Sequence, residues 1–361
     1  MVSNAMLEKL YGKENIVKAK ERYDICENNF ITEYNLNPEH IFRSPGRTEI
    51  SGNHTDHNLG KVLAASVNLD TIAFVSKSNN GIIRIKSREY SENRVDVGAD
   101  DPIRPLEEEK NSSNAIIRGV AARFVELGYK IGGLNAYTHS TVLKASGLSS
   151  SASFEVLIGT ILNHLYNDGK IAPKEIAKIA QYAENKYFGK PCGLMDQMTC
   201  SVGGFVSIDF KDKENPVVES VNFDFLKTSH SLCIVDVKAG HADLTDDYGD
   251  IKNEMGEVAK YYGKECLSEV DENRFYTNLA EIRKKVGDRP ILRAIHFFND
   301  NNRVKLEKET LQKGDFETFK KYVIESRTIF LHVSTKYLQY KSSIIAKCRS
   351  CTCTFRKIIK R

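Results

Sequence analysis

The chain has 361 residues, of which 41% are hydrophobic and 28% are charged, as in a typical soluble globular protein. This length favours two domains. The sequence has no apolar run of about 18 residues and no apolar secretory core near its N-terminus, so we expect a cytoplasmic protein that does not enter a membrane.

The net charge of +4 arises from one end of the chain. Nine of the 52 Lys and Arg residues lie within 327–361, a segment that contains no Asp or Glu. The rest of the chain has 43 basic and 48 acidic residues, a net charge of −5. This balance gives no electrostatic reason to expect a nucleic-acid partner.

Hydrophobic spacing predicts a mixture of helices and strands that do not strictly alternate, which favours an α+β fold. In chain order, we expect a helix over 6–35, a mostly irregular stretch over 42–60, strands over 72–76 and 82–86 joined as a hairpin at Asn79-Asn80-Gly81, a helix over 115–127 and a strand over 133–142. We then expect helices from Phe154 and over 173–188, strands over 203–210 and 232–237, and helices near 248–262, 275–286 and 290–325.

The stretch 144–155, Lys-Ala-Ser-Gly-Leu-Ser-Ser-Ser-Ala-Ser-Phe-Glu, is a loop of small residues that leads directly into the helix. Gly147 lets the backbone approach a ligand, and Ser149 to Ser151 supply hydroxyls that can cap the helix. The backbone N–H groups at a helix start bind phosphate well. The alternative interpretation is a capped helix after a flexible serine turn.

The stretch 42–60 is rich in groups that can bind a ligand, among them Arg47, Asn53, His54 and Asp56. Three interpretations are open. Imidazole and carboxylate groups at 54–57 could hold zinc, although ligands this close together rarely converge. The Asn and Asp residues could simply shape a loop. The third interpretation is a sugar site, in which these groups hydrogen-bond hydroxyls and Arg47 stabilises phosphoryl charge.

Two carboxylates elsewhere have equally open interpretations. Asp196 lies between apolar residues, where it could cap a helix or accept a proton from a hydroxyl as a general base. Glu184 falls on a predicted helix, where it could be solvated. Near a phosphate loop it becomes a candidate ligand for Mg²⁺, which binds one or two carboxylates together with phosphate oxygens.

Three separate stretches together resemble galactokinases of the GHMP small-molecule kinase superfamily. Residues 42–63 resemble the galactokinase signature, Gly147–Ala152 resembles the phosphate loop for ATP, and Gly193–Gln197 resembles the motif of the catalytic aspartate. The resemblance covers about residues 5–326. It implies a two-domain α+β fold, with an N-terminal domain like ribosomal protein S5 over 1–205, an incomplete α/β sandwich domain over 206–326, and an aberrant basic tail over 327–361.

The resemblance also implies the reaction, in which galactose and ATP give α-galactose 1-phosphate and ADP. Asp196 would be the base or electrostatic partner of the sugar 1-hydroxyl, and Arg47 its charge partner. The residues implied to contact the sugar are Asn53, His54, Asp56, Gly193 and Tyr248. The residues implied to bind ATP are Ser146, Gly147, Leu148, Ser149, Ser150, Ser151 and Ala152. Mg²⁺ would be held by Ser150 or Ser151 with Glu184, and we expect a monomer.

Four positions depart from the family pattern. Asn53 stands where the signature usually has Glu, and Glu49 where it usually has Asn; Leu143 and Ala145 replace the usual Pro and Gly before the serine loop. An amide at 53 keeps a hydrogen bond to a sugar hydroxyl but removes a charge, so the preferred sugar stays open. The alternatives are a kinase for N-acetylgalactosamine or arabinose, a non-catalytic sugar-binding or regulatory relative, and, more distantly, a metal hydrolase.

The resemblance ends near Ser326, and the basic tail contains no Gly or Pro. We expect a one-base frameshift at Ser326–Arg327, because codons for 327–340 and 346–360 can spell galactokinase-like text in the same neighbouring frame. A metal-binding cysteine cluster at Cys348, Cys351 and Cys353 and a basic interaction segment are the alternatives. Without the glycine-rich third motif of the family, we expect weak or absent turnover, and sequencing the gene tests the junction.

Overall fold

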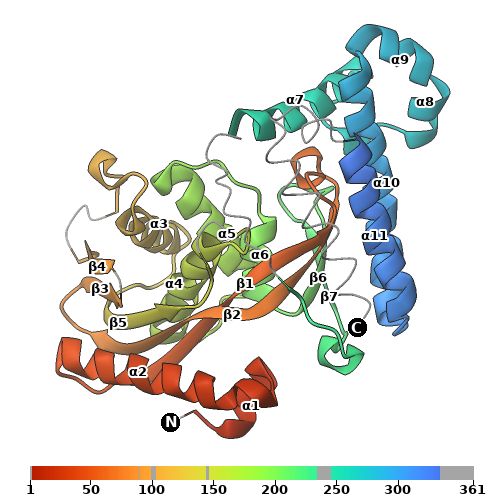
Figure 1. Cartoon of the computed structure of the whole chain (residues 1–361). Coiled ribbons are helices and arrows are strands. Elements are labelled where there is room, and N and C mark those ends of the chain that lie inside the picture. Colours follow the sequence, from red (N-terminus) through yellow and green to blue (C-terminus); the bar gives the residue numbers. More distant parts are fainter. Residues whose placement is uncertain (1, 89, 99–102, 144–145, 234–244, 334–361) are drawn as a thin grey trace, which may run out of the picture. The chain divides into compact units, whose positions relative to one another are not determined.

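The computed structural model describes residues 2–88, 90–98, 103–143, 146–233 and 245–333, with backbone only for 245–249 and 327–333. The chain divides into two compact units, one formed by Met1–Thr48 with Ser66–Gly203 and the other by Glu49–Ala65 with Gly204–Arg361. Helices and strands mix in the α+β manner that the sequence predicts (Figure 1). The domain limits expected from the resemblance are contiguous along the chain, and they stay a prediction.

The first unit combines a sheet with helices on both of its faces (Figure 1). Its elements are α1 (Asn4–Tyr11), α2 (Ile16–Tyr34), β1 (His40–Ser51), β2 (Lys61–Ser78), β3 (Ile82–Ser87), β4 (Tyr90–Asp96), α3 (Ser113–Glu126), β5 (Gly133–Ser140), α4 (Ser150–Tyr166), α5 (Pro173–Ala183) and α6 (Met195–Val202). β1 and β2 continue into the second unit, so the backbone of these two strands belongs to both.

Alternation along β2 places its side chains in two different cores. Ala73 and Val75 pack with α3, α4 and α5, whereas Ile72 and Phe74 pack with α1 and α2. Successive side chains of a strand point to opposite faces, so a strand covered by helices on both faces is apolar throughout. This explains why residues 72–75 of β2 form an unbroken apolar run.

The expected hairpin at Asn79-Asn80-Gly81 is wrong. The strand order is β4-β3-β5-β2, so β5 lies between β2 and β3. β2 pairs with β5 in an antiparallel arrangement, and β3 pairs with β5 in a parallel one. Asn80 Oδ1 accepts a hydrogen bond of 3.0 Å from the backbone N–H of Ile82, which ends the turn without pairing the two flanking strands.

The second unit is mostly helical. Its elements are β6 (Phe205–Asp209), β7 (Val217–Val221), α7 (Thr245–Tyr261), α8 (Glu272–Thr277), α9 (Leu279–Val286), α10 (Asp288–Gln312) and α11 (Phe316–Val333). β6 pairs with residues 61–65 of β2 and with β7. One apolar cluster joins α7 and α8 to the first half of α10, and another joins Leu63 and Val221 to Val304, Leu311 and Phe319.

Three predicted elements are shorter or differently arranged than expected. The long helix over 290–325 is two helices, α10 and α11, because Gly314 has φ of +74° and breaks the turn between them. Gly12, with φ of +84°, likewise divides the helix over 6–35. Residues 40–51 form β1 rather than a loop, because their backbone pairs with β2.

Two further expectations concern parts of the chain that are not described. Most of the expected strand over 232–237 lies outside the described residues, and so does the tail from 334 onward. The helix α11 runs across the expected junction at Ser326–Arg327.

None of the helices in the described part of the chain combines the length and the apolar composition that a membrane crossing requires.

Candidate active site

The serine loop leads into α4 through two backbone positions in the left-handed region, and the structure describes it from Ser146. Gly147 has φ of +75°, and a Cβ placed there would meet no atom within 4 Å. Ser149, with φ of +55°, immediately precedes α4. Its hydroxyl makes no capping hydrogen bond to the helix, so the capping role expected from the sequence is wrong for this residue.

The start of α4 is nevertheless arranged to accept an anion. The backbone N–H of Ser153 donates to Ser149 O, so the N–H groups of the three preceding residues have no carbonyl one turn earlier within the helix. Such N–H groups and the helix dipole favour phosphate. Of these three residues, Ser151 is exposed and Ala152 is buried. Earlier in the loop, the Ser146 hydroxyl donates to Leu143 O at 2.6 Å.

The two expected catalytic residues meet in the first unit. Arg47 of β1 forms a bidentate pair with Asp196 in the first turn of α6, with Nε–Oδ1 and Nη2–Oδ2 distances of 2.8 and 2.6 Å. The Ser149 hydroxyl donates to the same carboxylate. The Asp196 side chain is still 30% exposed, so its carboxylate is only partly covered by these donors.

Arg47 also ties β1 to the serine loop. Its backbone N–H donates to Leu148 O at 3.0 Å, and its guanidinium donates to Gly147 O. Gly46 permits this approach, since a Cβ there would lie 2.8 Å from Leu148 O. The serine loop, the arginine and the aspartate therefore form one connected group.

Glu184 approaches the serine loop from the end of α5, where a short π-helix (Glu184–Phe188) begins. Its side chain is almost fully buried, and its carboxylate accepts from Ser151 Oγ at 3.4 Å, Lys190 Nζ at 3.2 Å and Gln197 Nε2 at 2.8 Å. Ser150 makes no hydrogen bond to Glu184 among the described residues. Of the two expected serine ligands, Ser151 is thus the one that the structure brings to Glu184.

Sequence reasoning missed a buried group beneath this carboxylate. Gln197 Nε2 donates to Glu184 Oε2 and also to Glu155 Oε2, at 2.8 and 3.0 Å. Burial first, and then the negative charge of Glu184, raises the pKa of Glu155 well above its usual value. Burial likewise raises the pKa of the neighbouring Cys192 thiol. The signal in the sequence was a glutamate within the apolar first turns of α4.

The expected sugar residues Asn53, His54 and Asp56 lie in a turn of the second unit. Asn53 and His54 are half-buried, and His54 has φ of +62°. Thr55 stabilises the turn from inside. Its hydroxyl oxygen lies 2.8 Å from Gly52 O and 2.7 Å from Lys61 O and donates its hydrogen to these carbonyl groups. We call residues 51–58 the signature loop.

Polar groups of α10 hold the signature loop in place. His296 Nε2 donates to Asn53 O at 2.8 Å, Asp300 accepts from the Gly52 N–H at 3.3 Å, and Glu307 accepts from the Ser51 hydroxyl at 2.7 Å. All three side chains are buried. Their spacing along the helix places them on one face, so α10 presents a buried polar stripe to the loop.

The remaining expected site residues are placed as follows. Gly193 lies in the first unit, in the short loop before α6, where Asn185 Oδ1 accepts from the adjacent Cys192 N–H at 2.7 Å. Tyr248 lies on α7, and its side chain is outside the described residues. In the described part of the chain, His54, Asp56 and His57 do not join a cluster of three or more metal-binding side chains, which speaks against the zinc interpretation.

Comparison with known proteins places this arrangement in a family. A model of the galactokinase galactose-binding signature matches residues 28–77, and a model of the N-terminal domain of GHMP kinases matches residues 114–204. A galactokinase from Streptomyces coelicolor is 29% identical over 297 residues, which cover 81% of this chain and 74% of that protein. A galactokinase from Clostridium beijerinckii is 30% identical over 322 residues, covering 85% and 78%.

The chain belongs to the galactokinase family. Galactokinases are sugar kinases of the GHMP superfamily, phosphotransferases that take their phosphoryl group from ATP. The crystal structure of Lactococcus lactis galactokinase complexed with galactose aligns at 21% identity with a TM-score of 0.68, covering 85% of this chain and 79% of that one. Phosphomevalonate kinase from Streptococcus pneumoniae aligns at 12% identity with a TM-score of 0.52, covering 82% and 81%. These likenesses confirm the expected GHMP kinase fold.

Proposed function

We propose that this member of the galactokinase family transfers the γ-phosphoryl group of ATP to the 1-hydroxyl of galactose, giving α-D-galactose 1-phosphate and ADP. The observation that carries the proposal is the bidentate pair of Arg47 and Asp196, attached directly to the serine loop. Phosphoryl transfer depends mainly on alignment and on stabilisation of developing charge. A carboxylate, a guanidinium and free helix N–H groups in one connected group can provide both.

In this proposal Asp196 receives the sugar 1-hydroxyl as a hydrogen-bond donor and takes its proton as the phosphorus–oxygen bond forms. Arg47 stays paired with the aspartate and keeps the carboxylate correctly oriented. The Ser149 hydroxyl, which donates to Asp196, fixes the second carboxylate oxygen. The phosphate chain of ATP lies along residues 146–152, with the N–H groups at the start of α4 directed to its oxygens.

The Ser151 and Glu184 pair fits a magnesium ion bound together with ATP. Mg²⁺ usually takes one or two carboxylates and fills its other positions with water and phosphate oxygens. Ser151 Oγ and Glu184 Oε1 are 3.4 Å apart at the start of α4, so an oxygen donor and a carboxylate already converge there. When bound, the ion would neutralise charge on the phosphate oxygens, while Gln197 and Lys190 hold the carboxylate in place.

Asn53, His54, Asp56, Gly193 and Tyr248 are proposed to contact the sugar. Asn53 is the residue that decides between galactose and a related sugar, since it supplies an amide where the family signature usually has a carboxylate. A kinase for N-acetylgalactosamine or arabinose is therefore the second candidate. It rests on this single substitution.

The test is an ADP-release assay with galactose, N-acetylgalactosamine, arabinose and glucose as separate substrates. Because the tail after Ser326 is expected to lower turnover, the assay is run at high enzyme concentration on this chain and on a frame-restored version, with sugar binding measured by calorimetry alongside. We expect galactose to give the highest rate. A higher rate with N-acetylgalactosamine or arabinose would favour the second candidate, and sugar binding without any turnover in either version would favour a non-catalytic relative.

A further inference from the structure

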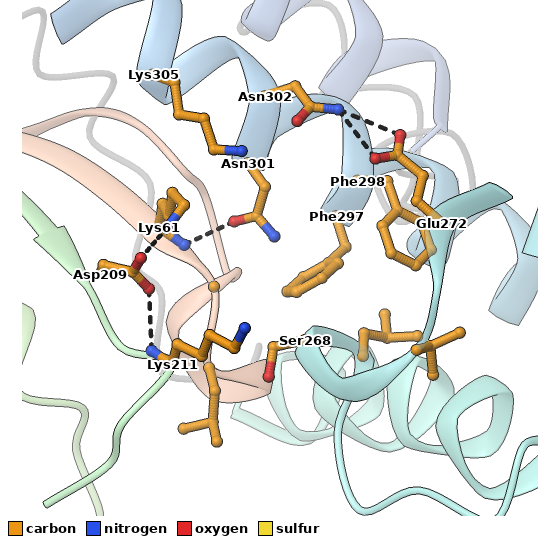
Figure 2. A pocket seen from close by; sticks show the side chains of 14 residues that line it. Lys61, Asp209, Lys211, Ser268, Glu272, Phe297, Phe298, Asn301, Asn302 and Lys305 are labelled. Atoms are coloured by element: carbon orange, nitrogen blue, oxygen red, sulfur yellow. Dashed lines mark hydrogen bonds and ion pairs between the residues drawn. The ribbon is translucent and has the colours of Figure 1, made fainter.

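A pocket of about 250 Å³ lies in the second unit, beside the turn that follows the signature loop (Figure 2). None of the residues proposed for the reaction lines it. Its walls come from the turn at Leu59–Lys61, the end of β6 with Lys211, the segment 267–272 and the middle of α10. This pocket is thus a separate feature that the proposed phosphoryl transfer does not explain.

Three lysines give one side of the pocket a positive charge. Lys61 Nζ pairs with Asp209, whereas the amines of Lys211 and Lys305 form no ion pair with any residue that the structure describes. Burial, followed by the positive charges of Lys305 and Lys211, lowers the pKa of Lys61. Lys211 and Lys305 are therefore each close enough to Lys61 to repel its charge, and an anion in the pocket would relieve this repulsion.

Asn301 adds a neutral donor on the same side. Its Oδ1 accepts a hydrogen bond of 2.6 Å from the backbone N–H of Lys61. This bond fixes the orientation of the amide, so the nitrogen is the atom left to face the pocket (Figure 2). A carboxylate here would repel an anion, whereas an amide nitrogen donates to one.

The opposite side of the pocket is mostly apolar, and its one carboxylate, Glu272, accepts hydrogen bonds of 3.2 and 3.1 Å from Asn302 Nδ2. The rings of Phe297 and Phe298 face the lysines across the opening in Figure 2. Leu267 and Val270 also line the pocket and belong to the same apolar cluster as these rings. All four side chains are buried in the unit, with at most 7% exposed, so this wall is part of the core rather than a mobile surface. A ligand that fits both sides needs an anionic group at one end and a carbon skeleton at the other.

We propose that this pocket binds a small phosphorylated metabolite, with its phosphate among Lys211, Lys305 and Asn301 and its carbon skeleton against Phe297. A phosphate offers three oxygens to the donors on this side of the pocket, and lysines bind phosphate as point charges. The volume lies just below the range of pockets for drug-sized ligands, which suits a monosaccharide phosphate and is too small for a nucleotide. The proposal stands whether or not the chain phosphorylates galactose.

The test is calorimetric titration of the full chain with inorganic phosphate, glucose 6-phosphate, glucose and gluconate as separate probes. We expect glucose 6-phosphate to bind most tightly, inorganic phosphate more weakly, and glucose and gluconate at least ten-fold more weakly than glucose 6-phosphate. Raising the salt concentration should weaken the binding of both phosphate probes. Equal affinity for gluconate or for glucose would overturn the assignment of a phosphate site.

Variants locate the binding. The exposed pair Lys211→Ala/Lys305→Ala and the single change Asn301→Asp, which keeps the acceptor for the Lys61 N–H, should each weaken glucose 6-phosphate roughly ten-fold or more. Lys313→Ala at the end of α10 is the matched lysine control and should bind as the unchanged chain does. Arg47→Ala should also retain binding, which separates this pocket from the proposed reaction site. Unchanged affinity in the double variant and in Asn301→Asp, or loss in Arg47→Ala alone, would contradict the proposal.

Discussion

At the scale of single residues, one carboxylate collects the groups that the chemistry needs. Asp196 is paired with Arg47 through two hydrogen bonds and receives the Ser149 hydroxyl, yet its side chain stays 30% exposed. These donors fix the orientation of the carboxylate, while the exposed part leaves room for a substrate hydroxyl. Removing the charge should therefore affect turnover much more than binding.

The change Asp196→Asn keeps the shape of the side chain and removes its capacity to accept a proton. We expect kcat to fall by about 10²–10⁴-fold, with sugar and ATP binding changed little. Asp168→Asn is the matched control, because Asp168 is exposed and pairs only with Lys170 in the described structure. The ADP-release assay measures kcat, and a variant that keeps its full rate would remove Asp196 from the mechanism.

Gln197 is the residue that allows two buried carboxylates to lie close together. Its amide nitrogen donates to both Glu155 and Glu184. The change Gln197→Leu leaves both acceptors without this donor, and we expect the free energy of unfolding to fall by about 1–3 kcal/mol. Urea unfolding measures the loss. Gln312→Leu, at the exposed end of α10, is the control and should stay within about 0.5 kcal/mol of the unchanged chain.

At the scale of elements, α10 links the fold to the signature loop. Its buried polar stripe, formed by His296, Asp300, Arg303 and Glu307, recurs every three or four residues along one face. Three of these side chains bond the loop, while Arg303 pairs with Asp300. The helix thus contacts the signature loop through directional hydrogen bonds, which fix the positions of Asn53 and its neighbours.

Replacing His296 by Ala removes the hydrogen bond to Asn53 O and leaves that carbonyl without this donor. We expect KM for the sugar to rise roughly five- to ten-fold, with KM for ATP unchanged, because the serine loop belongs to the other unit. Glu309→Ala, on the exposed side of α10, is the matched control. Equal increases in both KM values would indicate general destabilisation rather than a positioning role.

Glu307 makes the stability of the chain depend on pH. Burial, followed by the nearby charge of Asp300, raises its pKa to about 8, although Ser51 and Arg303 oppose the shift. Between its ordinary pKa near 4.5 and this value the folded chain holds a proton that the unfolded chain has released, so stability falls as pH rises through this range. In Glu307→Gln this dependence should be reduced by up to about 1.4 kcal/mol per pH unit.

Urea unfolding of the unchanged chain and of Glu307→Gln at a series of pH values from 5 to 9 measures this dependence. Above the pKa of Glu307 the free energy of unfolding should change with pH equally in both proteins, because the folded and the unfolded states have both released the proton. Parallel curves across the whole range would contradict the assignment.

Local motifs could be located from the sequence, but their contacts could not. The resemblance to galactokinases predicts ligand binding by the stretch 147–152, Arg47 and Asp196; the structure brings these parts together, and their roles stay a prediction. Glu155 and Gln197 were missed, since a buried polar side chain in an apolar helix has no sequence signal apart from its position. The hairpin at 79–81 failed because turn residues do not show that β5 inserts between two neighbouring strands.

The role of α10 was beyond sequence reasoning for a related reason. Its polar stripe contacts residues that are more than 200 positions earlier in the chain, such as Asn53 from His296. The spacing of apolar residues predicts the helix. For its charged face, however, this spacing predicts exposure to solvent. Only the tertiary fold shows that this face is buried against the signature loop.

At the scale of the whole molecule, the proposed groups are shared between two compact units. The serine loop, Arg47, Asp196 and Glu184 belong to the first, and the signature loop with α10 belongs to the second. β1 and β2 carry the chain from one unit to the other immediately before and after the signature loop. The expected monomeric state stays a prediction that sedimentation velocity would check.

The most direct test of the account is single-turnover ADP release from ATP and galactose, measured on this chain and on its frame-restored version with and without Asp196→Asn. The account predicts ADP and galactose 1-phosphate in equal amounts, dependent on galactose and lost in the variant. Galactose and ATP binding without any galactose-dependent ADP in either version, or release that is unaffected by Asp196→Asn, would contradict it.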